Sequence, residues 1–247
     1  APVPGQRVSY GTVGCVMTQE HTPSAALGTP GPAAEPAPPA KPRWRGWIHT
    51  ALTPLALLAG LVLLVLTPTI PGRLAAAVYL LSSLALFGNS AAYHRGTWTE
   101  RVGSVLRRVD HANIYLFIAG TYTPLAVQLL EGPSRVALLV LVWVCAAAGV
   151  AFRLLWMGAP RWLYTALYLA MGWIAVFWLI QFWAAGGPAV VLLIAAGGLV
   201  YSYGAAVYGR RRPDPWPATF GFHEIFHACT GAAFLLHFAA ICVATFG

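Results

Sequence analysis

The sequence predicts an all-α integral membrane protein in which seven helices form a transmembrane bundle. The first reason is composition: hydrophobic residues make up 58% of the 247-residue chain and charged residues only 9%. About 25% charged residues is ordinary for a soluble protein, so this chain has too few polar side chains to cover a surface that faces water. The second reason is a series of seven apolar segments, and the third is an uneven distribution of Lys and Arg between the loops.

Residues 1–42 differ in kind from the rest of the chain. They hold nine of the nineteen prolines together with Ala, Gly, Thr and Ser, and they show no apolar period, which is typical of disordered segments. We therefore expect a disordered cytoplasmic tail at 1–42 and a seven-transmembrane domain at 43–247. Met17, inside the tail, is a candidate for the natural translation start.

Each predicted helix is a continuous apolar segment of about 20 residues. At about 1.5 Å per residue, such a segment crosses a hydrocarbon core of about 30 Å. The segments lack the alternation of apolar and polar residues that membrane β-barrel strands show. Separated by short polar breaks, they cover residues 47–67, 74–94, 110–130, 135–156, 161–183, 189–208 and 221–245.

The basic residues predict the orientation of the bundle, because cytoplasmic loops carry an excess of Lys and Arg. Loops on one side would hold only Arg73 and Arg135. This asymmetry predicts a cytoplasmic N-terminus, an outward C-terminus and a multi-pass location in the cell (plasma) membrane. It also accounts for the net charge of +8 without nucleic acid, which requires basic residues clustered on one face. Loops on the other side would hold Lys41, Arg43, Arg45, Arg95, Arg101, Arg107, Arg108, Arg153, Arg161, Arg210, Arg211 and Arg212.

Ionisable residues within the predicted helices are functional candidates, because burying one in a bilayer is costly unless it is paired or bound to a metal. The predicted topology brings His94, Asp110, His223 and His227 to one depth near the cytoplasmic leaflet. His223 and His227 are four residues apart, so their imidazoles share one helix face. Together with His94 they supply three nitrogen ligands and leave a fourth position for water, as in catalytic zinc (Zn2+) sites. The alternative is a set of hydrogen-bonded core or interfacial histidines.

Asp110 and Ser90 are the candidate catalytic residues beside this site. Asp110 would orient or deprotonate the water, or else it is a helix N-terminal residue favoured by the helix dipole. Ser90, one turn from His94, would donate to a substrate carbonyl or developing oxyanion, or else bond back to its own helix. His237 is expected to be a core hydrogen-bonding residue or to line a substrate cavity.

Residues 223–227 also match the H-E-x-x-H motif, whose Glu is the general base of metalloproteases. The twenty residues that follow His227 offer His237 but no carboxylate as a third ligand. We therefore disfavour a protease.

At these residues the sequence resembles the haemolysin III family, the bacterial branch of the progestin and adipoQ receptor superfamily, which also contains the adiponectin receptors. The resemblance implies a seven-helix bundle with a cytoplasmic N-terminus. It also implies zinc bound by His94, His223 and His227, with Ser90 and Asp110 close to the metal water. It spans residues 41–245 and rests on RGWIH at 45–49, SAAYH at 90–94, RRVDHANIY at 107–115, AGTYTP at 119–124, RPDPWP at 212–217, GFHEIFH at 221–227 and HF at 237–238.

The site and the resemblance together lead us to expect a zinc-dependent hydrolase of membrane lipid amides or esters that serves membrane lipid homeostasis. The ceramidase-like chemistry is implied by the eukaryotic relatives, and the expected partners are membrane lipids. One alternative is a non-enzymatic, lipid-responsive receptor or regulator with structural zinc. The other is a pore-forming cytolysin, which we disfavour because the helices are typical of a permanently inserted polytopic protein.

Overall fold

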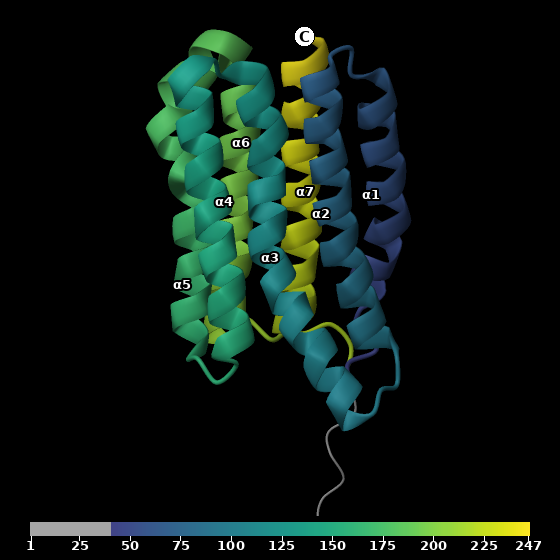
Figure 1. Ribbon diagram of the computed structural model, residues 1–247. Coiled ribbons are helices and arrows are strands. Elements are labelled where there is room, and N and C mark those ends of the chain that lie inside the picture. Colours follow the sequence, from purple (N-terminus) through teal and green to yellow (C-terminus); the bar gives the residue numbers. More distant parts are fainter. Residues whose placement is uncertain (1–40) are drawn as a thin grey trace, which may run out of the picture. The chain divides into compact units, whose positions relative to one another are not determined.

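The computed structural model describes residues 41–247, and within them the protein is a bundle of α-helices (Figure 1). The all-α prediction is confirmed, since regular structure outside the helices is limited to one isolated β-bridge between Trp216 and Phe220 in this part of the chain. Met17 and nearly all of the predicted tail lie outside the described residues. The helices are α1 (Trp47–Leu66), α2 (Ile70–Arg95), α3 (Glu100–Leu129), α4 (Gly132–Leu155), α5 (Arg161–Gly172), the 3-10 helix η1 (Trp173–Trp178), α6 (Leu179–Arg210) and α7 (Phe222–Phe246).

Five helical stretches are long and apolar enough to cross a membrane: α1, α2, α4, α7 and the continuous stretch 161–210 formed by α5, η1 and α6. Large apolar side chains cover the outside of the bundle. Leu155, Phe177 and Ile180, for example, are 87%, 81% and 87% exposed. A surface this rich in exposed apolar groups is stable against lipid and not against water, so the chain is a membrane protein.

The stretch 161–210 reverses its direction at Gly187. This residue has φ 72°, which favours glycine, and the proline that follows it cannot donate the next helical hydrogen bond. Arg161 Nη1 donates to the Tyr208 carbonyl at 3.3 Å, and Trp173 Nε1 donates to Ser202 Oγ at 3.0 Å. The chain before Gly187 is therefore antiparallel to the chain after it, as the separate helices predicted at 161–183 and 189–208 require.

Helix α3 begins ten residues before its predicted start at 110. The Thr99 hydroxyl accepts the N–H of Val102 at 3.4 Å, and Glu100 places a negative charge in the first turn, both of which favour a helix start. The apolar pattern marks only the membrane-spanning part of this helix. Asp110 consequently lies about three turns inside α3, and the alternative that it is a helix N-terminal residue is wrong.

Helix α7 packs against α1, α3 and α6, while α1 to α4 are sequential neighbours (Figure 1). Glycines allow the close approach that membrane helices use. A Cβ atom on Gly60 would lie 2.6 Å from Leu80 Cδ1, and one on Gly204 would lie 2.6 Å from Cys229 Cβ. This packing brings the first turns of α7 close to the last turn of α2.

The two ends of the bundle differ in charge as the loops predict. Hydrogen bonds of 3.1 Å from the backbone N–H groups of Arg43 and Trp44 tie the segment before α1 to the loop between α6 and α7. The ends of α2, α4 and α6 and the starts of α3, α5 and α7 lie at this basic end, and the C-terminus lies at the other (Figure 1).

Candidate metal centre

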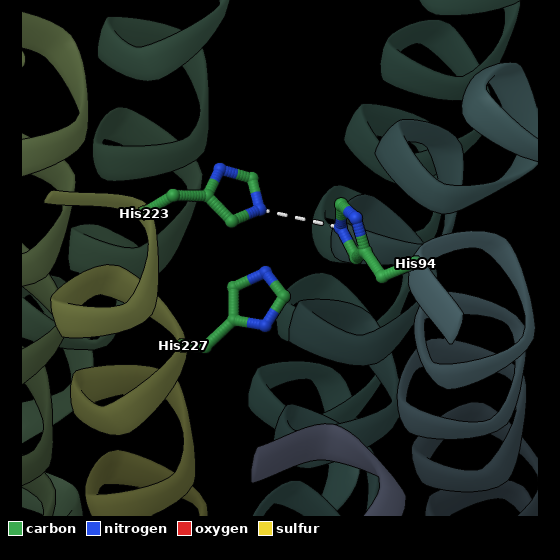
Figure 2. A group of neighbouring side chains, drawn as sticks. All are labelled: His94, His223 and His227. Atoms are coloured by element: carbon green, nitrogen blue, oxygen red, sulfur yellow. Dashed lines mark hydrogen bonds between the residues drawn. The ribbon is translucent and has the colours of Figure 1, made fainter. Parts of the chain in front are cut away.

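Three histidines from two helices face one another at the basic end of the bundle (Figure 2). His94 lies in the last turn of α2, and His223 and His227 lie in the first two turns of α7. The Nε2 atoms of His94 and His223 are 3.2 Å apart, and one ring nitrogen from each histidine lies within 4.8 Å of the other two. The structure thus brings together the three residues that the sequence selected as ligands.

The distance between the His94 and His223 nitrogens is compatible with a tetrahedral metal ion. Two zinc–nitrogen bonds of about 2.0–2.1 Å at the tetrahedral angle place their nitrogens about 3.3 Å apart, close to the 3.2 Å between His94 and His223. Without an ion, one of these rings can donate its N–H to the other. Imidazole suits zinc and several other transition ions, so the cluster could hold a metal ion but does not select which one.

A fourth histidine, His49 of α1, supports the cluster. Its ring stacks on that of His227 with 3.8 Å between centroids and 8° between planes, and Phe87 packs edge-on against it at 5.2 Å. His49 is only 3% exposed, and within residues 41–247 neither of its ring nitrogens has a hydrogen-bond partner. This contact restricts the plane of the His227 ring. In the sequence, His49 was notable only as part of the RGWIH motif.

Asp110 lines a cavity together with the three histidines. The Ser90 hydroxyl lies close to the Asp110 carboxyl. Ser90 is 1% exposed and is not among the described residues that line the cavity. Because it lies close to Asp110, Ser90 is a candidate for orienting the Asp110 carboxyl, and its predicted catalytic role stays a prediction.

Glu224, the glutamate of the H-E-x-x-H sequence, has both carboxylate oxygens engaged elsewhere. Oε1 accepts a hydrogen bond from Arg45 Nε at 2.6 Å, and Oε2 accepts one from the Gly221 N–H at 2.9 Å. The side chain therefore caps α7 and neutralises Arg45. These contacts support the sequence-based argument against a metalloprotease.

The cavity beside the histidines has a volume of about 260 Å³. A second, mostly apolar cavity of about 90 Å³ lies between α3, α5, η1, α6 and α7, and the two share Tyr168 and Tyr201. His237 lines the second cavity, where its Nε2 lies 3.3 Å from the Ile194 carbonyl oxygen. It is therefore a core hydrogen-bonding residue, and a substrate in this cavity stays a prediction. Besides the cluster and Asp110, the first cavity is lined by Arg45, Tyr93, Arg107, His111, Ile114, Arg161, Tyr164, Thr165, Tyr168, Tyr201, Ala205, Tyr208, Phe222 and Phe226.

The tyrosines and arginines of this lining could not be identified as site residues from the sequence. The hydroxyl oxygens of Tyr164 and Tyr208 are 3.5 Å apart, and the Tyr168 hydroxyl donates to the His111 carbonyl at 3.0 Å. These residues come from three different helices, so no local spacing connects them. In the sequence, the positions of the arginines indicated only the orientation of the protein in the membrane.

Known proteins resemble this chain over most of its length. Residues 39–238 match the family model described as haemolysin-III related. Over 131 residues the chain is 34% identical to the hemolysin-3 homolog of Bacillus subtilis, covering 53% of this chain and 61% of that protein. Over 131 residues it is 31% identical to hemolysin-3 of Bacillus cereus, covering 53% of this chain and 59% of that protein. It is 26% identical over 186 residues to the human monocyte to macrophage differentiation factor, covering 68% of this chain and 69% of that protein. The matches thus span about three fifths of the two bacterial relatives' length.

Proposed function

This chain belongs to the haemolysin-III-related family, and on that premise we propose that it is a zinc-dependent hydrolase of membrane lipid amides or esters. The observation that carries the proposal is the convergence of three imidazoles beside a cavity that Asp110 also lines. Three nitrogen ligands leave a position for water, which is typical of catalytic rather than structural zinc. The substrates are lipids of the membrane in which the helices lie.

The proposal includes seven membrane crossings within a domain at 43–247. Four of the five apolar stretches cross once, 161–210 crosses twice because it reverses at Gly187, and α3 supplies the remaining crossing. The concentration of basic residues at the end where α1 begins supports a cytoplasmic N-terminus. An odd number of crossings then puts the C-terminus outside the cell membrane.

His94, His223 and His227 would hold the ion, with the stacked ring of His49 restricting the rotation of His227. When bound, zinc would supply Lewis acidity and would lower the pKa of a nearby water. Side chains of the protein would then transfer protons and orient the lipid.

Asp110 is the proposed proton acceptor, because it is the only carboxylate among the described residues that line the cavity. It would take a proton from the attacking water and return it to the leaving amine or alkoxide. Ser90 is the proposed positioning residue, since its hydroxyl lies close to the Asp110 carboxyl.

The apolar second cavity supports a lipid substrate. Its walls come from helices whose outer faces carry exposed apolar side chains such as Phe177 and Ile180 and would lie against lipid. Its mostly apolar lining is suited to part of an acyl chain. Tyr168 and Tyr201 border both cavities. A chain bound in the second cavity would direct its carbonyl group toward the histidines.

The test is metal analysis combined with hydrolysis of a panel of N-acyl and O-acyl lipids by purified protein in detergent. The expected result is one zinc per chain in the wild type and in Asp110→Asn, with turnover about 100-fold lower in the variant. Glu100→Gln, a change in the exposed first turn of α3, serves as the control with unchanged turnover. Bound metal without any wild-type turnover would reject the hydrolase and favour the receptor or regulator with structural zinc.

A further inference from the structure

Three arginines line the cavity beside the histidines, and only one of them is neutralised by a carboxylate. Arg45 forms an ion pair with Glu224 at 2.6 Å, the one ion pair present among residues 41–247. Arg161 instead donates to the Tyr208 carbonyl at 3.3 Å, and its guanidinium lies 4.7 Å from the centroid of the Tyr208 ring. Arg107 is exposed and lines the cavity. Arg107 and Arg161 therefore leave two positive charges facing the cavity.

A third uncompensated guanidinium, that of Arg153, lies next to the cavity wall. Arg153 is 1% exposed, and its Nε and Nη1 atoms have no hydrogen-bond partner in the described part of the chain. Its guanidinium lies 4.3 Å from the ring centroid of Tyr164, which lines the cavity. A buried charge without a counter-ion is costly, and a negatively charged ligand in the cavity would reduce that cost.

The three guanidiniums come from α3, α4 and α5 and lie at or beside the cavity. Arg107 and Arg161 line it, and Arg153 lies against Tyr164 of its wall. The charge asymmetry that orients the protein in the membrane does not depend on these three arginines. Without them, nine of the twelve basic residues predicted for this end of the bundle remain.

We propose that these arginines of the cavity bind an oxyanion, and that the substrates are lipids whose headgroup carries a phosphate next to the scissile acyl bond. Arg107 and Arg161 are the direct ligands, because guanidinium forks bind phosphate oxygens in pairs. Arg153 adds positive potential through the Tyr164 ring. A neutral headgroup would leave all three charges unpaired, and the single negative charge of Asp110 is outnumbered by them.

The hydrolysis of such lipids rests on the proposed function, whereas the binding of the oxyanion does not. Binding is therefore measured without turnover, by microscale thermophoresis of purified full-length protein in dodecylmaltoside micelles. The probes are phosphatidic acid and diacylglycerol analogues whose two identical chains are joined by ether bonds that a hydrolase cannot cleave, and inorganic phosphate. The variants are Arg107→Gln and Arg161→Gln, with Arg108→Gln as the matched control because Arg108 is adjacent and exposed but does not line the cavity.

The wild type is expected to bind the phosphatidic acid analogue at least about tenfold more tightly than the diacylglycerol analogue. Arg107→Gln and Arg161→Gln should each remove most of that preference, Arg107→Lys should restore part of it, and Arg108→Gln should keep it. An equal loss in Arg108→Gln would overturn the site in favour of a general effect of the basic face. Tight binding of inorganic phosphate with the same arginine dependence would overturn the lipid headgroup as the ligand.

Two further results separate this inference from the proposed function and from misfolding. If the wild type hydrolyses no lipid but shows the arginine-dependent preference, the proposed function fails and the oxyanion site stands. If it hydrolyses lipids without any preference for the phosphate, the oxyanion site fails. Arg107 is exposed on the first turns of α3, so Arg107→Gln should fold even where Arg161→Gln does not.

Discussion

Variants of Glu224 test whether this glutamate stabilises the fold or takes part in the metal chemistry. Its two oxygens accept hydrogen bonds from Arg45 at 2.6 Å and from the Gly221 N–H at 2.9 Å. Glu224→Gln removes the charge and keeps an acceptor for the Gly221 N–H. Glu224→Ala removes both, so the two variants measure the ion pair and the helix cap separately.

The exposure of the two side chains sets the expected magnitude. Removing one partner of a fully buried ion pair costs about 3–5 kcal/mol, whereas an exposed pair contributes only about 0–1 kcal/mol. Glu224 is 2% exposed and Arg45 is 23% exposed, so we expect about 1–3 kcal/mol for Glu224→Gln. Loss of the cap adds about 1 kcal/mol, which brings Glu224→Ala to about 2–4 kcal/mol.

The assay is thermal unfolding in detergent, followed with a thiol-reactive dye at Cys145, Cys229 and Cys242, which are free. The apparent Tm should fall from wild type to Glu224→Gln and again to Glu224→Ala, with the metal content unchanged. Arg45→Gln combined with Glu224→Gln should be less destabilising than the sum of the single changes. Loss of metal at an unchanged Tm would refute the reasoning, because it would make Glu224 part of the metal chemistry.

Three other predictions test the metal centre and the packing around it. His227→Ala should abolish metal binding, measured by elemental analysis. Free zinc at a concentration of 100 times its Kd should stabilise the wild type by about 2.7 kcal/mol and should not stabilise the variant. His49→Ala should weaken zinc binding about tenfold in a competition titration. His49→Phe should bind like wild type, because the ring nitrogens of His49 have no partner in the described chain; weakening by both changes would disprove a stacking role. Gly204→Ala should lower the Tm by crowding Cys229 at 2.6 Å, whereas Gly198→Ala, with its nearest contact at 3.7 Å, should not.

The three histidines could be predicted together because two simple rules place them. Helical periodicity puts His223 and His227 on one face of α7. The alternation of membrane crossings then puts the end of α2, and with it His94, at the depth of the start of α7. The start of α3 was misplaced because hydropathy marks where a helix enters lipid, while the Thr99 cap and the turns after it lie outside that apolar window.

Contacts that depend on helix rotation could not be predicted from the sequence. The stack of His49 on His227, the pairing of Arg45 with Glu224 and the position of Arg153 behind Tyr164 all join different helices. A helix that is apolar on every side has no pattern that says which face packs inward. The same lack of pattern hid the arginines of the cavity.

The sequence by itself determined the helical membrane fold, the asymmetry of charge between the two ends and the three candidate metal ligands. Each of these depends only on composition or on spacing along the chain. The thickness of the bilayer sets the length of an apolar helix, and helix geometry sets which residues share a face. Only the tertiary structure decided which side chains surround those ligands. Close helix packing at positions such as Gly204 sets the rotation and separation of each helix. These two quantities determine that Arg45 pairs with Glu224 and that Arg107 and Arg161 line the cavity without an ion pair.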